Sequence, residues 1–175
     1  MPRRHPLPRL WLMTDERMGD ALWEALARLP RGAGVVFRHY GLPPAKRRAL
    51  FARVLKVARR RGLVLVRAGS EPMRGESGAH AAPGRGLRTA PAHSRREAIA
   101  ARRAGAHALF VSPTFATRSH PGARPLGRAR FGLLVRGLDV PVIALGGLDA
   151  RKAASLKPFG IHGWAAIDAW SAQRR

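Results

Sequence analysis

Cysteine is absent from the chain, and acidic residues are few. The absence of cysteine excludes disulfides, thiolate nucleophiles and cysteine-based metal sites. No apolar run approaches the ~20 residues of a membrane-spanning helix. The run Leu10-Trp11-Leu12-Met13 is too short for the apolar core of a signal peptide and leads directly into charged residues. We therefore expect a cytoplasmic protein that does not enter a membrane.

The shortage of acidic residues leaves a formal net charge of +23, from 33 basic and 10 acidic residues. Lysine is scarce too, at positions 46, 56, 152 and 157, and the other basic residues are arginines spread along the whole length. The clusters Lys46-Arg47-Arg48 and Arg59-Arg60-Arg61 are not interleaved with aromatic residues, and no nucleic-acid-binding motif is recognisable. The charge therefore favours small anionic substrates over nucleic acid, which stays an alternative.

Apolar runs and amphipathic stretches alternate along the chain, and this alternation predicts strands followed by helices. Ser94 with Glu97 three positions later has the pattern of a helix-starting capping box, and Asp149 is a second candidate cap. The expected strands are 10–14, 35–38, 63–66, 78–81, 87–92, 106–111, 140–145 and 161–167. The expected helices are 21–29, 43–61, 95–104, 128–137 and 149–157.

Repeated strand–helix units predict a parallel sheet with right-handed crossovers, and eight strands indicate a (β/α)8 TIM barrel in one domain, 1–175. A typical barrel has ~250 residues, so this one is expected to be trimmed around strands three to five. Helices are replaced by loops near 70–77 and 82–85 in this interpretation. A doubly wound open sheet is the alternative.

Two polar loops follow neighbouring strands of the second half. Residues 112–122 form a loop rich in hydroxyl groups, proline and glycine, and Gly146-Gly147 end the run Val142-Ile143-Ala144-Leu145. Glycine lets backbone N–H groups approach a ligand closely, and hydroxyl and N–H groups are suitable donors to phosphate. Phosphate sites of TIM barrels follow strands seven and eight, so the glycine pair near the C-terminus favours the barrel over the open sheet.

These two segments resemble the thiamine phosphate synthase and TenI (thiazole tautomerase) superfamily. The family's Gly-Pro-Val-Phe-Pro-Thr-x-Thr-Lys-Pro-Gly loop corresponds to 112–122, its Ala-Ile-Gly-Gly-Ile to 144–148, and the resemblance extends from 12–15 to 163–168. It implies an enzyme of thiamine biosynthesis that joins an aminopyrimidine diphosphate to a thiazole phosphate. The alternatives are a non-catalytic, TenI-like regulatory protein that binds thiazole phosphate, and a TenI-like tautomerase. The histidine of TenI-like members aligns with Pro113, however.

The resemblance also implies site residues and partners. Phosphorylated thiazole and pyrimidine compounds are the expected ligands, and the oligomeric state is left open, with a homodimer among the alternatives. Asp168 stands where the family has serine, so its carboxylate would repel a phosphate unless a cation intervenes. The implied catalytic residues are Arg38, His93 and His120. The implied thiazole-phosphate residues are Thr117, Ser119, Gly146, Gly147, Ile167 and Asp168.

The family's magnesium-binding aspartates are not matched. One falls in Arg67-Ala68-Gly69 and the other in Ala82-Pro83-Gly84, so no metal ligand is predicted and the cofactor is left unknown. One hypothesis is that cationic side chains neutralise the diphosphate in place of the metal. The other is that synthase activity is weak or lost. The cationic candidates are Arg38, Arg67, His93 and His120.

Overall fold

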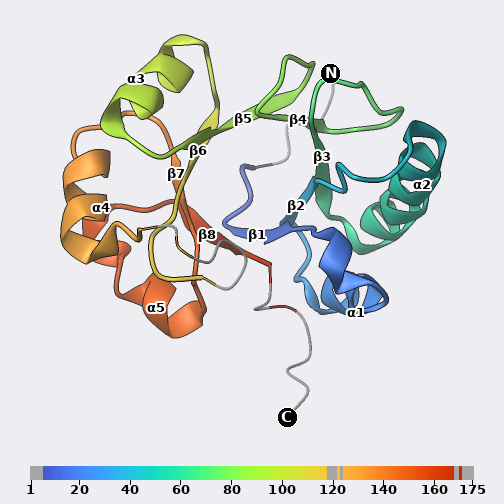
Figure 1. Cartoon of the computed structure of the whole chain (residues 1–175), viewed down its shortest axis with the longest axis horizontal. Helices are drawn as coiled ribbons and strands as arrows, with labels where there is room; N and C mark the ends of the chain where they lie inside the picture. Colours follow the sequence, from blue (N-terminus) through green and yellow to red (C-terminus); the bar gives the residue numbers. More distant parts are fainter. Residues whose placement is uncertain (1–5, 118–121, 123, 168–169, 171–175) are drawn as a thin grey trace.

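Eight parallel strands close into a barrel in the computed structural model of the chain, each strand pairing with its neighbours in sequence and β1 with β8 (Figure 1). The structure describes residues 6–117, 122, 124–167 and 170. The predicted TIM barrel is confirmed, and the open-sheet alternative is wrong because β1 pairs with β8. The strands are β1 (Leu10–Met13), β2 (Gly34–Phe37), β3 (Val64–Ala68), β4 (Gly78–His80), β5 (Leu87–Ala92), β6 (Ala108–Val111), β7 (Val142–Leu145) and β8 (Gly163–Ala166).

Helices cover the barrel unevenly (Figure 1). The described loops 69–77 and 81–86, on either side of β4, contain no helix, as predicted. The last predicted helix, 149–157, is shorter than expected and gives way to a 3-10 turn over Lys157–Phe159 that contains Pro158, which lacks an N–H donor. The α-helices are α1 (Ala21–Arg28), α2 (Pro44–Arg61), α3 (Arg95–Arg103), α4 (Gly127–Val135) and α5 (Ala150–Ala154), and a further 3-10 turn spans Glu16–Met18. Among the described helices, none has the length and apolar character needed to cross a membrane.

The predicted helix starts are confirmed in atomic detail. The Ser94 hydroxyl accepts a hydrogen bond from the backbone N–H of Glu97, and the Glu97 carboxylate accepts one from the backbone N–H of His93. The Asp149 carboxylate likewise accepts from the backbone N–H of Lys152. These bonds satisfy donors that would lack a partner at a helix start, so local sequence alone fixes where α3 and α5 begin.

Side chains alternate between the interior of the barrel and its outer layer. The interior cluster takes every second residue from strands all round the barrel, among them Trp11, Val36, Val66, Phe110 and Ile143. The residues between them pack outward, in one cluster with α1 and α2 and in another with α3, α4 and α5. This period of two tells which way each polar residue on a strand faces.

Arg67 occupies the outer layer beside β4, where the loops replace helices. It follows the outward-facing Leu65 by two positions, and its side chain is 1% exposed. The guanidinium forms an ion pair with Glu76 (Nε–Oε2 2.8 Å) and donates hydrogen bonds to the carbonyl oxygens of Gly69 and Pro83. One buried cation thus joins both loops to β3.

Candidate functional site

The carboxyl ends of the strands form what we call the barrel mouth, the end at which TIM barrels bind ligands. Arg38 and Ser112 stand two positions beyond the interior residues Val36 and Phe110, so strand alternation turns both toward the mouth. His80 is the last residue of β4 and meets the Phe110 ring edge-on, with 5.0 Å between ring centroids. The structure therefore brings polar groups from β2, β4 and β6 to the same end of the barrel.

The two polar loops predicted from the sequence lie against each other. The backbone N–H of Thr114 donates to the carbonyl of Leu145 (2.9 Å), and that of Phe115 donates to Gly146 (3.0 Å). The buried Thr114 hydroxyl also donates to the Leu145 carbonyl, at 3.0 Å. Thr114 and Phe115 thus continue the β6–β7 pairing beyond the strands and fix both loops in one position.

Glycine is required in the second loop for two reasons. Gly146 and Gly147 have φ angles of +103° and +60°, which side-chain-bearing residues rarely adopt. A Cβ atom on Gly147 would lie 2.1 Å from the carbonyl oxygen of Ala116. The backbone of Gly147 is therefore pressed against the first loop, as a site built from backbone groups requires.

Other predicted thiazole-phosphate residues are placed as follows. Thr117 is half-buried in the first loop and already interacts within the chain, and Ile167 directly follows β8. Ser119, His120 and Asp168 lie outside the described residues. Sequence reasoning did not single out Lys152, whose ammonium donates to the carbonyl of Gly147 (3.1 Å) and lies 5.9 Å from the centre of the Phe115 ring. It adds a positive charge where the two loops meet.

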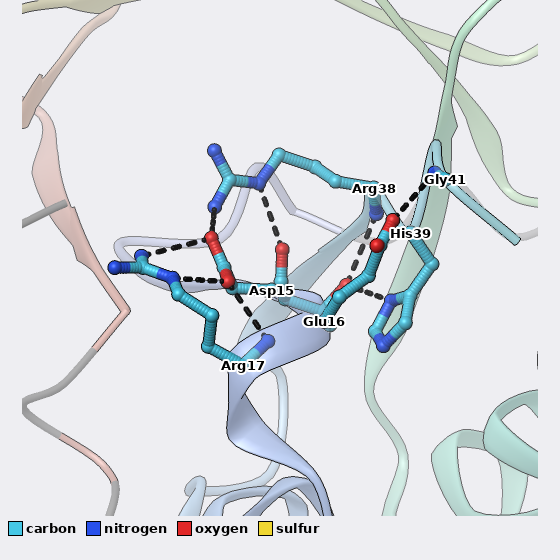
Figure 2. A network of polar contacts seen from close by, with 7 residues as sticks. Asp15, Glu16, Arg17, Arg38, His39 and Gly41 are labelled. Carbon is cyan, nitrogen blue, oxygen red and sulfur yellow. Dashed lines mark hydrogen bonds and ion pairs between the residues drawn. The ribbon is translucent and has the colours of Figure 1, made fainter. Parts of the chain in front are cut away.

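Arg38 is held at the mouth by the end of β1 (Figure 2). Its Nε donates to the backbone carbonyl of Thr14 (2.7 Å) and its Nη2 pairs with Asp15 (3.0 Å), while its own N–H donates to the Thr14 hydroxyl. Nη1 has no partner among the described residues. Arg38 is therefore a fixed cation with one free pair of N–H donors.

The carboxylate of Asp15 lies between two arginines, Arg17 and Arg38 (Figure 2). Hydrogen bonds from Arg17, supported by the charges of both guanidiniums, lower the pKa of Asp15 to about 2. Asp15 thus stays ionised at any ordinary pH and keeps Arg38 in place. Local sequence does not point to Thr14 or Asp15 for this role, since their partner Arg38 is 23 or more positions away.

His93 presents one nitrogen as a hydrogen-bond acceptor. Its Nδ1 lies 2.9 Å from the backbone carbonyl oxygen of Ser112 and 3.3 Å from the Ser112 hydroxyl. A carbonyl can only accept, so Nδ1 carries the hydrogen and Nε2 of the neutral ring is left with its lone pair. In that form His93 can accept a proton from a ligand but has none to give from Nε2.

Magnesium, which the family resemblance implies, does not fit the residues present. Positions 67–69 and 82–84 offer no carboxylate, and the nearby Asp15 and Glu76 are paired with arginines. Within the described part of the chain, no three histidine, aspartate or glutamate side chains come together as metal ligands. The hypothesis that Arg67 neutralises the diphosphate is also wrong, because Arg67 is buried outside the barrel and bonded to Glu76 and the two loops.

Comparison with known proteins agrees with this geometry. A family model described as thiamine monophosphate synthase matches residues 87–170. The chain is 35% identical over 79 residues to a thiamine-phosphate synthase from Chloroflexus aurantiacus, covering 45% of the chain and 37% of that protein. It is 39% identical over 75 residues to one from Salinispora tropica, covering 42% and 36%. The predicted family is confirmed. Its second half, residues 87–170, matches the thiamine phosphate synthase/TenI superfamily.

The family model matches the second half of the chain, and the matched segments span less than half the length of these curated relatives. The fold extends further. The solved thiamine phosphate pyrophosphorylase from Pyrococcus furiosus superposes with a TM-score of 0.78 at 21% identity, over 97% of this chain and 90% of that one. The first half therefore completes the same barrel fold as that solved structure.

Proposed function

We propose that this superfamily member binds a thiazole phosphate at the loops after β6 and β7 and acts as a thiamine phosphate synthase-like enzyme of thiamine biosynthesis. The observation that carries the proposal is the contact between the two loops. Gly147 packs on Ala116, and Phe115 bonds to Gly146. This joins the superfamily's two motif loops into one surface of backbone donors and hydroxyls. In this proposal residues 1–175 form one cytoplasmic barrel domain.

The proposed reaction joins two phosphorylated substrates. The bond between the pyrimidine methylene carbon and the diphosphate oxygen breaks, with its electron pair leaving on pyrophosphate, and the thiazole nitrogen then forms the new bond to that carbon. The backbone of Gly147 and the hydroxyl of Thr117 hold the thiazole phosphate. The free Nη1 of Arg38 binds the departing pyrophosphate, and Lys152 adds charge at the other phosphate. No step is assigned to a metal.

A second candidate is a non-catalytic thiazole-phosphate binder. The observation in its favour is Arg67, which stands with Gly69 and Pro83 where the family has magnesium carboxylates and which serves to join loops. Both candidates share the thiazole-phosphate site, and they differ in whether the diphosphate is bound and cleaved.

Two measurements test the proposal. Titration with a thiazole phosphate should show binding to the wild type and loss of binding in Gly147→Asp, whose side chain would collide with Ala116. Gly137→Asp is the matched control, because Gly137 has a similar φ of +68° but open space around it, at the other end of β7. Complementation of a synthase-deficient strain then separates the candidates. Binding with growth supports the enzyme, binding without growth supports the second candidate, and absence of binding overturns both.

A further inference from the structure

A buried threonine faces a histidine inside the barrel mouth. Thr89 of β5 pairs in register with His80 of β4, and the Thr89 hydroxyl lies 2.9 Å from His80 Nδ1. Thr89 is 3% exposed and His80 6% exposed. The pair is therefore shielded from water. The hydrogen between the Thr89 hydroxyl oxygen and His80 Nδ1 is then assigned from the neighbouring donors and acceptors of the protein.

The hydrogen of this bond belongs to the threonine. A buried hydroxyl hydrogen needs an acceptor, and among the described residues His80 Nδ1 is the partner that the Thr89 hydroxyl has. If Nδ1 carried the hydrogen instead, the hydroxyl hydrogen would be left without an acceptor. Nδ1 therefore accepts, and the hydrogen of the neutral ring sits on Nε2.

Nε2 of His80 reaches the barrel mouth. It makes no hydrogen bond with the described residues, and it is not one of their enclosed side-chain atoms without a partner, so it is accessible to a ligand. Burial, with a contribution from the charge of Arg38, lowers the pKa of His80 to about 4. The imidazole is therefore neutral. The strand register places Arg38 level with Ala68 of β3, which pairs with His80 of β4.

We propose that Thr89 is a positioning residue that fixes His80 as a neutral Nε2–H donor, and that His80 and Arg38 together bind an anionic phosphate oxygen without a metal ion. The donor is rigid because both the ring and its tautomer are held by β5. The identity of the ligand rests on the proposed function. The proposal assigns a phosphate ligand to the side of the mouth where positions 67–69 and 82–84 carry no metal-binding carboxylate.

The tautomer is tested first, in the unmodified protein. Imidazole ¹⁵N spectra at pH 7 should show His80 with an unprotonated Nδ1 and a protonated Nε2. Thr89→Val removes the hydroxyl at nearly constant volume, so Nδ1 loses its hydrogen-bond donor and its ¹⁵N resonance should shift, whereas Thr89→Ser should retain the wild-type spectrum. A wild-type ring with its hydrogen on Nδ1 overturns the proposal without any variant having to fold.

Binding is tested with inorganic pyrophosphate in the presence of a chelator. A hydrogen bond to a charged group corresponds to roughly tenfold or more in affinity, so Thr89→Val and His80→Phe should weaken binding by about that factor and Thr89→Ser should not. A requirement for magnesium, or unchanged affinity in folded Thr89→Val, overturns the proposal. Thiazole phosphate binding should be unchanged in these variants. If the wild type did not bind thiazole phosphate, the proposed function would be wrong, but the pyrophosphate measurement would still test the role of Thr89 and His80.

Discussion

Arg38 and Asp15 form an ion pair across the ends of β2 and β1, with 3.0 Å between Nη2 and Oδ2 and both side chains 19% exposed. The pair leaves Nη1 of Arg38 free toward the barrel mouth. It also makes the position of this mouth-facing cation depend on a carboxylate.

Asp15→Asn should loosen Arg38 and reduce stability in mildly acidic solution. The pKa of Asp15 is about 2 in the folded protein, below its ordinary value of 3.8. A carboxyl with a depressed folded pKa stabilises the protein above the unfolded value, and this contribution is lost as the pH falls through the folded value. Thermal unfolding between pH 5 and about 2 should therefore decline more steeply in the wild type than in Asp15→Asn. Asp139→Asn, which removes an exposed ion pair with Arg102, is the control and should follow the wild type.

Arg67→Met should be among the most destabilising substitutions in the chain. It leaves the carboxylate of Glu76 without its buried partner, and breaking a buried pair in this way costs about 3–5 kcal/mol. Arg48→Met removes the exposed pair with Glu71 and should cost about 0–1 kcal/mol. Urea unfolding measures both. Equal costs for the two variants would contradict the role assigned to Arg67.

Gly147→Ala should cost more than Gly137→Ala. Both positions have φ near +60° to +70°, so both lose about 1 kcal/mol from backbone strain. At Gly147 the added methyl group would also meet the Ala116 carbonyl, and relieving such a clash costs about 1–3 kcal/mol more. Chemical denaturation gives the difference directly. The same variant should weaken thiazole phosphate binding, because the two loops must separate.

Lys152→Met should weaken thiazole phosphate binding while leaving stability nearly unchanged. The ammonium is exposed and lies beside Gly147 and Phe115, so its loss removes about 0.3–1 kcal/mol of attraction to a phosphate, roughly two- to fivefold in affinity. Lys157→Met removes the same charge from the 3-10 turn after α5 and is the control. The effect of Lys152→Met should shrink at high salt, and a salt-independent loss would point to packing on Phe115 instead.

The sequence predicted what depends on neighbours along the chain. The strands follow from apolar runs, and the starts of α3 and α5 follow from Ser94 with Glu97 and from Asp149, whose partners are three or four positions away. β6, β7 and β8 begin two residues later than predicted, and Ala106, Val140 and Ile161 pack on the outer cluster ahead of these strands.

The candidate site depended on contacts between strands, which the sequence did not reveal. Thr14 with Arg38, Thr89 with His80, and His93 with Ser112 are joined through the register of the barrel. Arg67 shows the limit most clearly. Its position in the alignment suggested a ligand-facing cation, but strand alternation from Leu65 turns it outward, and counting positions along β3 would have indicated this.

The missing helices beside β4 have a consequence for how the barrel opens. β4 has three residues, and the loops on both of its sides depend on Arg67 for their attachment. Local unfolding requires least free energy where few apolar contacts must be broken. Backbone amide hydrogens of β4 should therefore exchange with deuterium well before those of β2 and β7. The barrel would then unfold locally at β4 while the loops after β6 and β7 stay folded.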